Sequence, residues 1–155
     1  MSYTIVDLPE CAVVGPTIRT ANDSPACTAD IGGLWQRFME SGMDNAVPGA
    51  HIAPYTCFGL YYNYDMTSNE YDLLVGCETD AAAPEGMVRQ VIPAGRYAKF
   101  EIRGGDCVKS VAEMWTVVWE DTELTAQRAF TVDFEAYLPG EDMSNADIDI
   151  FIALK

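Results

Sequence analysis

Residues 129–137 read Ala-Phe-Thr-Val-Asp-Phe-Glu-Ala-Tyr, and residues 146–154 read Ala-Asp-Ile-Asp-Ile-Phe-Ile-Ala-Leu. Both runs alternate with a period of two, which is typical of a strand with two different faces. A polar loop containing Pro139 and Gly140 separates them. The two runs therefore predict a β-hairpin that closes the fold.

The two faces of this hairpin differ in chemistry. The even-numbered residues are almost all apolar, so we predict that they share a core face. The odd-numbered residues combine carboxylates with aromatic rings, and they include Asp133, Glu135, Tyr137, Asp147, Asp149 and Phe151. An ordinary solvated face does not need this mixture, so the odd face is where we look for function.

The composition indicates one globular domain. The chain has 155 residues, of which 49% are apolar and 21% charged, and its mean hydropathy is −0.01. No apolar run approaches the roughly 18 residues that span a bilayer. The N-terminus lacks the basic and apolar regions of a signal peptide. We therefore expect a cytoplasmic protein with no membrane contact.

Charge and cysteine content exclude several classes. The net charge of −15 repels phosphate, so we expect no direct binding to nucleic acid, whereas organic cations are attracted. The five cysteines are scattered without a CxxC pair, and His51 is the one histidine. We therefore predict reduced thiols, no metal site and no cofactor.

The order of predicted elements suggests an internal duplication. Residues 3–78 predict extended segments, a helix carrying Trp35 and a hairpin of strands 55–63 and 71–77. Residues 87–155 repeat this order, with a strand at 95–102, a helix at 107–119 carrying Trp115 and the closing hairpin. We predict a single α+β domain built from two strand-helix-strand-strand units. Its curved antiparallel sheet would carry two helices on one face and a ligand groove on the other.

The sequence contains none of the common nucleotide-binding, hydrolase or metalloprotease motifs. Carboxylates and aromatic rings remain, a combination that suits an organic cation. The candidates facing the groove are Glu135, Asp149, Tyr137 and Phe151, joined by Tyr55, Tyr61 or Tyr62, and Tyr71. Alternatively, these are rim residues of a half-solvated sheet. Both interpretations stay open for Glu135, whereas Asp133 and Asp147 are expected in solvent.

Several segments in a fixed order resemble a known family. They are Leu34-Trp-Gln-Arg-Phe38, Gly59-Leu-Tyr-Tyr62, Ile92-Pro-Ala-Gly-Arg-Tyr-Ala-Lys-Phe100, the helix with Trp115 and Trp119, and Asp133-Phe-Glu-Ala-Tyr137. Together they resemble the GyrI-like effector-binding domain, the ligand-sensing module of AraC- and MerR-type multidrug regulators. The resemblance spans nearly the whole chain.

The resemblance implies a site for hydrophobic cations, held between the two halves by a buried glutamate and stacked aromatic rings. The family glutamate falls on Glu135, and a second acid found in some members falls on Asp149. The aromatic lining falls on Tyr61, Tyr137 and Phe151, together with Trp115 or Tyr97. The sequence shows no helix-turn-helix, so it resembles stand-alone members, some of which are carried on integron cassettes. A homodimer and a separate DNA-binding partner protein are both open.

Three functions follow as hypotheses. The first is a non-enzymatic module that binds cationic drugs or amphipathic metabolites, for sequestration or sensing. The second is hydrolysis of electrophilic small molecules, with Glu135 as general base and a tyrosine nearby. The third is a gyrase-inhibitor-like protein whose acidic surface imitates nucleic acid.

Overall fold

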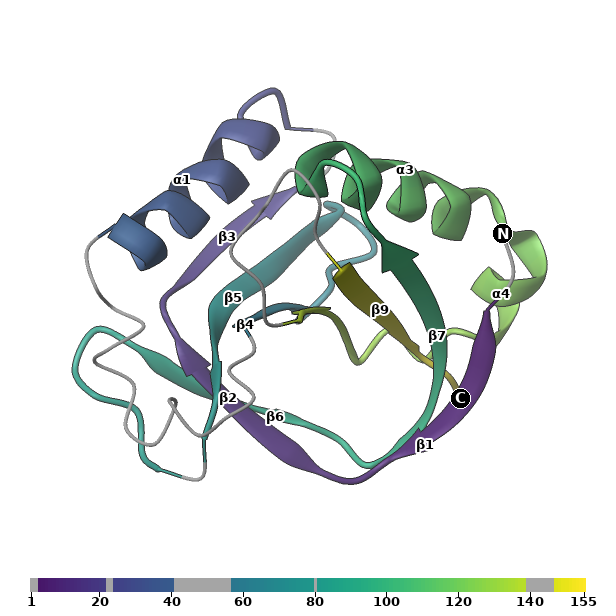
Figure 1. The fold of residues 1–155 in the computed structure, drawn as a ribbon, viewed down its shortest axis with the longest axis horizontal. Helices are drawn as coiled ribbons and strands as arrows, with labels where there is room; N and C mark the ends of the chain where they lie inside the picture. Colours follow the sequence, from purple (N-terminus) through teal and green to yellow (C-terminus); the bar gives the residue numbers. More distant parts are fainter. Residues whose placement is uncertain (1–2, 22–23, 41–56, 80, 139–146) are drawn as a thin grey trace.

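The structure is a computed structural model that describes residues 3–21, 24–40, 57–79, 81–138 and 147–155. In this part of the chain, nine strands form one antiparallel sheet and three helices pack outside its curve (Figure 1). The predicted α+β class and the curved antiparallel sheet are confirmed. The duplication into two units stays a prediction.

The elements follow the chain in two groups. The first group comprises β1 (Thr4–Leu8), β2 (Cys11–Gly15), β3 (Thr17–Ala21), α1 (Cys27–Glu40), β4 (Cys57–Tyr62) and β5 (Glu70–Glu78). The second comprises β6 (Val88–Ile92), β7 (Gly95–Arg103), α3 (Cys107–Glu120), α4 (Thr122–Gln127), β8 (Val132–Tyr137) and β9 (Asp147–Ala153). The short helix α4 was not predicted. Strand β8 begins at Val132 rather than at residue 129, because Phe130 adopts a left-handed backbone with φ of 55°.

Pairing between strands gives one continuous, curved sheet. The strand order is β1-β7-β9-β8-β4-β5-β2-β6, with β3 also on β5. Strands β1 and β2 follow each other along the chain, as do β6 and β7, and they pair β1 with β7 and β2 with β6. These two segments therefore join the ends of the sheet, which curves round in Figure 1. Strands β8 and β4 lie in the middle of the order.

Both faces of the sheet are buried. On the inner face of the curve, the core includes Phe58, Leu60, Leu74, Phe134 and Phe151. On the outer face, which we call the helix face, α3 packs on Phe100, Ile150 and Ile152, and α1 packs on Leu73 and Val75. The closing hairpin is therefore buried on both faces, and the prediction that the site residues face a groove opposite the helices is wrong for Glu135, which lies on the helix face.

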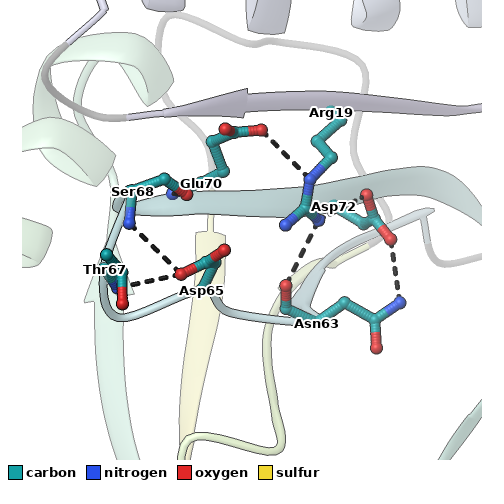
Figure 2. Close-up of polar contacts among 7 residues, drawn as sticks. All are labelled: Arg19, Asn63, Asp65, Thr67, Ser68, Glu70 and Asp72. Carbon is teal, nitrogen blue, oxygen red and sulfur yellow. Dashed lines mark hydrogen bonds and ion pairs between the residues drawn. The ribbon is translucent and has the colours of Figure 1, made fainter.

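A polar turn fixes the register of β4 and β5 (Figure 2). Arg19 on β3 contacts Glu70 Oε2 at 3.2 Å and Asp72 Oδ1 at 3.0 Å, and it donates to the Asn63 carbonyl. Asp65 accepts hydrogen bonds from the backbone amides of the next turn. Exposed ion pairs add little stability. Their role here is to hold the end of β4, which carries Tyr61.

Two glycines allow β2 and β5 to approach closely, and Gly76→Ala tests this contact. A Cβ atom at Gly76 would lie 2.1 Å from the Val14 carbonyl oxygen, and one at Gly15 would lie 1.9 Å from the Val75 carbonyl oxygen. Because the clashing atoms are backbone, we expect Gly76→Ala to lower the free energy of unfolding by about 2 kcal/mol or more. Urea denaturation measures this change.

The control for this prediction is Gly32→Ala in α1, where a Cβ atom would meet nothing within 4 Å. Alanine is favoured over glycine in a helix by about 1 kcal/mol, so this variant should be more stable than the wild type. Equal stability of the two variants would contradict the close approach of β2 and β5.

Candidate functional site

Four of the predicted site residues meet on the helix face around Glu135. This carboxylate lies near the middle of β8 and is 1% exposed. Tyr61 Oη donates to Glu135 Oε2 at 2.8 Å, Trp115 Nε1 donates to the same oxygen at 2.6 Å, and Tyr137 Oη donates to Oε1 at 2.7 Å. Strands β4 and β8 and helix α3 thus each supply a donor. We call these four residues, with Trp35, the Glu135 cluster.

The register of β4 and β8 makes room for the carboxylate. Gly59 lies directly opposite Glu135 in this strand pair. A Cβ atom at Gly59 would lie 3.3 Å from Glu135 Oε1 and 3.2 Å from Trp35 Cζ2. These distances are tighter than ordinary van der Waals contact, so a larger residue here would displace the carboxylate or the indole. Glycine leaves the space between Trp35 and Glu135 free of a side chain.

Aromatic rings surround the carboxylate on several sides. The Trp35 ring of α1 meets the Tyr137 ring edge-on at 4.7 Å, and the Trp115 ring of α3 meets Tyr61 at 5.0 Å. Tyr71 lies 5.5 Å from Tyr61 between ring centroids. The two helices therefore each contribute one tryptophan. Trp35 was not predicted as a site residue, although its place in the first unit, matching that of Trp115 in the second, was a usable signal.

Burial controls the protonation of the cluster. Burial raises the pKa of Glu135 above that of an ordinary glutamate, while its three hydrogen bonds act in the opposite direction. The pKa values of Tyr61 and Tyr137 are also well above the ordinary value, chiefly because their hydroxyl groups are buried and secondly because Glu135 is negative. Both tyrosines therefore remain neutral donors at physiological pH.

Three other predicted site residues lie on the inner face, so the prediction that they share a groove with Glu135 is wrong. The register pairs Glu135 with Ile150, which puts Asp149 and Phe151 on the opposite side of the sheet. Phe151 stacks on Phe134 at 4.6 Å. The Tyr97 ring meets Phe134 edge-on at 5.7 Å, and its hydroxyl donates to the Pro93 carbonyl.

Asp149 already forms ion pairs with two side chains of the protein itself. Its carboxylate lies 2.9 Å from Arg103 Nη2 and 3.7 Å from Lys99 Nζ. This ion-paired carboxylate has less need of an external counter-ion than Glu135. Tyr62, an alternative to Tyr61, also packs on the inner face, and Tyr55 and His51 lie outside the described residues.

The prediction that Asp133 is solvated is wrong, because it is fully buried. Its Oδ2 lies 2.6 Å from Arg128 Nη2 and accepts a hydrogen bond from Tyr64 Oη at 2.6 Å. Its Oδ1 accepts from the Ala153 amide, and the Arg128 guanidinium lies 4.2 Å from the Phe130 ring centroid. The Asp133 carboxylate therefore already has a cation and an aromatic ring beside it within the protein. Asp147 is exposed, as predicted.

Among the described residues, no group of three or more histidine, cysteine, aspartate or glutamate side chains could hold a metal ion. In the same part of the chain, every helix is too short or too polar to cross a membrane.

The chain is similar to known effector-binding proteins over its whole length. Residues 4–154 match a family model described as Cass2, integron-associated effector binding protein. The transcriptional regulator BrlR of Pseudomonas aeruginosa is 29% identical over 163 residues, which cover 99% of this chain. They cover 56% of that relative, so the chain spans about half its length.

Solved structures share the fold. The integron cassette protein VCH_CASS2 of Vibrio cholerae has a TM-score of 0.74 at 25% identity, with 99% of this chain and 96% of that chain covered. SAV2435, solved bound to tetraphenylphosphonium, has a TM-score of 0.79 at 18% identity, with 100% and 94% covered. Both the match to a family model and the similarity to solved structures therefore support the assignment of the fold.

Proposed function

Because the chain belongs to the Cass2 family of integron-associated effector-binding proteins, we propose that it binds hydrophobic organic cations at the Glu135 cluster. The ligand would lie between Trp35 of α1 and Trp115 of α3, with Glu135 as its counter-ion. The proposal assigns the effector binding of the family to specific residues of this chain.

The observation that carries the proposal is a contrast between two buried carboxylates on the same strand. Asp133 has a tyrosine donor, an aromatic ring and an internal cation, Arg128. Glu135 has tyrosine and tryptophan donors and aromatic rings, but within the described residues no lysine or arginine forms an ion pair with it. A buried carboxylate without a cation is costly. An external cation would supply what Arg128 supplies to Asp133.

The expected energies favour a lipophilic cation. A counter-ion about 4 Å from the carboxylate contributes on the order of 4 kcal/mol at an effective dielectric constant near 20. Each aromatic ring facing the cation adds about 0.5–2 kcal/mol. Such a ligand also loses little hydration energy on burial. The net charge of −15 further attracts cations toward the protein.

Entry to the site requires side-chain movement, because Glu135 is almost fully buried. Tyr61, Tyr137 and Trp35 are only partly buried, so their rings form the outer part of the cluster. We expect these rings to move aside and then pack against the ligand. Both glutamate oxygens already accept hydrogen bonds, which suits a fixed counter-ion better than a general base holding a water molecule.

A titration with tetraphenylphosphonium tests the proposal. SAV2435 was solved with this cation, which makes it a suitable probe. Binding is followed by tryptophan fluorescence, since Trp35 and Trp115 belong to the cluster. Triphenylphosphine oxide, which has aromatic rings but no net charge, is the control ligand. Tighter binding of the cation than of the oxide supports the proposal, and equal binding contradicts it. In a separate assay, chemical conversion of an electrophilic ester would favour the hydrolase hypothesis instead.

We expect the affinity for tetraphenylphosphonium to rise with pH. The pKa of Glu135 is raised by burial above the ordinary value of about 4.3, and only the ionised form is a counter-ion. Below this raised pKa, affinity should therefore increase by up to about tenfold per pH unit. Fluorescence titrations from about pH 4 to about pH 8 measure the slope. A wild-type slope no steeper than that of Glu135→Gln would contradict this assignment.

The stability of the unliganded protein should change with pH in the opposite direction, because the contribution of Glu135 falls as pH rises. Because the folded state holds a proton on Glu135 over a range where the unfolded state does not, this group stabilises the fold below the ordinary glutamate pKa. That contribution is lost as pH rises through the raised pKa.

How the bound state is used is a further part of the proposal. The relative BrlR is a transcriptional regulator about twice as long as the matched segment. This chain could therefore sequester cations, or it could pass the signal to a DNA-binding partner protein. Both roles require the binding step that the titration measures.

A further inference from the structure

A pair of cysteines lies next to the Glu135 cluster without being part of it. Cys57, the first residue of β4, is directly opposite Cys77 on β5. Both side chains belong to the hydrophobic cluster beneath α1, so they lie on the same face of the sheet. On its other side, Cys57 is paired with Tyr137 of β8, a hydrogen-bond donor to Glu135.

The backbone pattern gives the type of this cross-strand pair. The Val75 amide donates to the Pro16 carbonyl and the Thr79 amide donates to the Ala12 carbonyl, so both point away from β4. Backbone polar groups alternate in direction along a strand, so Cys77, midway between these residues, also points away from β4. Cys57 and Cys77 therefore form a non-hydrogen-bonded pair.

This geometry suits a disulfide. In a non-hydrogen-bonded pair the two Cα atoms lie about 4.5 Å apart, and disulfides join Cα atoms about 4.4–6.8 Å apart. The strands would need little movement to form the bond. None of the other three cysteines has a cysteine opposite it in the strand registers of the described chain.

We propose that Cys57 and Cys77 are a redox-modification site, at which oxidation joins their sulfur atoms in a reversible disulfide between β4 and β5. The oxidant is a small disulfide. The Cys57 thiolate attacks one of its sulfur atoms and releases a small thiol. Cys77 then loses its proton and attacks the Cys57 sulfur, which releases the second small thiol. Two protein thiols are oxidised, and the small disulfide is reduced to two thiols.

The burial of the two thiols sets the order of these steps. Cys77 is fully buried, whereas Cys57 is 7% exposed and begins its strand, where opening of the sheet is easiest. Cys57 therefore meets the oxidant first, and Cys77 reacts within the protein. The bond would fix the spacing of β4 and β5 beside Tyr137.

Peptide mapping after treatment of the full chain with oxidised glutathione tests this proposal. We expect a linked pair of peptides containing Cys57 and Cys77, which dithiothreitol separates. The same link should form in a variant with Cys11→Ser, Cys27→Ala and Cys107→Ser, which keeps only this pair. In Cys77→Ser, glutathione should stay on Cys57.

The proposal is overturned if glutathione stays on Cys57 in the wild type, or if both thiols survive while Cys11 and Cys107 are modified. Thermal unfolding of the oxidised triple variant gives a second readout. The midpoint should rise by about 5 °C and return on reduction. An unchanged or lower midpoint would show that the pair is not positioned for the bond. Neither readout depends on cation binding, so this proposal and the proposed function fail separately.

Discussion

Replacing Glu135 with glutamine is expected to weaken tetraphenylphosphonium binding by roughly 100- to 1,000-fold. The substitution removes a buried counter-ion worth on the order of 4 kcal/mol, and 1.4 kcal/mol corresponds to a tenfold change in affinity. Glutamine keeps the size and most of the packing of Glu135, so the loss reports on charge. Fluorescence or calorimetric titration at neutral pH gives both dissociation constants.

Asp147→Asn is the matched control for this substitution. It removes the same charge from an exposed position of the neighbouring strand β9. Its effect on affinity should be less than about threefold, because exposed charges are screened by solvent and salt. Equal losses in the two variants would mean that overall acidity, rather than the Glu135 cluster, attracts the cation.

Replacing Arg128 with methionine is expected to lower the free energy of unfolding by about 3–5 kcal/mol. The Arg128 side chain is 6% exposed and that of Asp133 is fully buried, so the substitution leaves an unpaired charge inside the protein. Asp133 also binds the Ala153 amide, so the change should loosen the end of β9. Urea denaturation measures the loss.

Two further variants serve as controls for this prediction. Arg19→Met removes two exposed ion pairs, to Glu70 and Asp72, and should cost less than about 1 kcal/mol. Combining Arg128→Met with Asp133→Leu removes both buried charges and should recover part of the stability. An Arg128→Met protein as stable as Arg19→Met would contradict the account of Asp133 as a carboxylate satisfied by its own cation.

The sequence predicted the strands because they depend on local pattern, whereas Glu135 was selected by the resemblance to a family. Alternation along residues 129–137 and 146–154 identified both strands of the closing hairpin, and the resemblance identified Glu135. The register between two strands decides which of their residues share a face of the sheet. Asp149 was grouped with Glu135 by chemistry, whereas the pairing of Glu135 with Ile150 separates them.

Asp133 shows a second limit of sequence reasoning. Alternation correctly placed it on the same face of its own strand as Glu135, but its partner Arg128 lies before the strand, beyond a turn with a left-handed Phe130. No periodic pattern predicts that contact. Trp35 was likewise predicted on a helix but not in the site, because its approach to Tyr137 depends on how α1 lies on the sheet.

A crystal structure with tetraphenylphosphonium tests most directly whether Glu135 binds an external cation on the helix face. We predict the phosphonium between Trp35 and Trp115, with its rings against these side chains and Glu135 as the nearest carboxylate. The phosphorus should lie within about 6 Å of an aromatic ring centroid. A cation bound on the inner face beside Asp149, or at the surface away from Glu135, would contradict the claim.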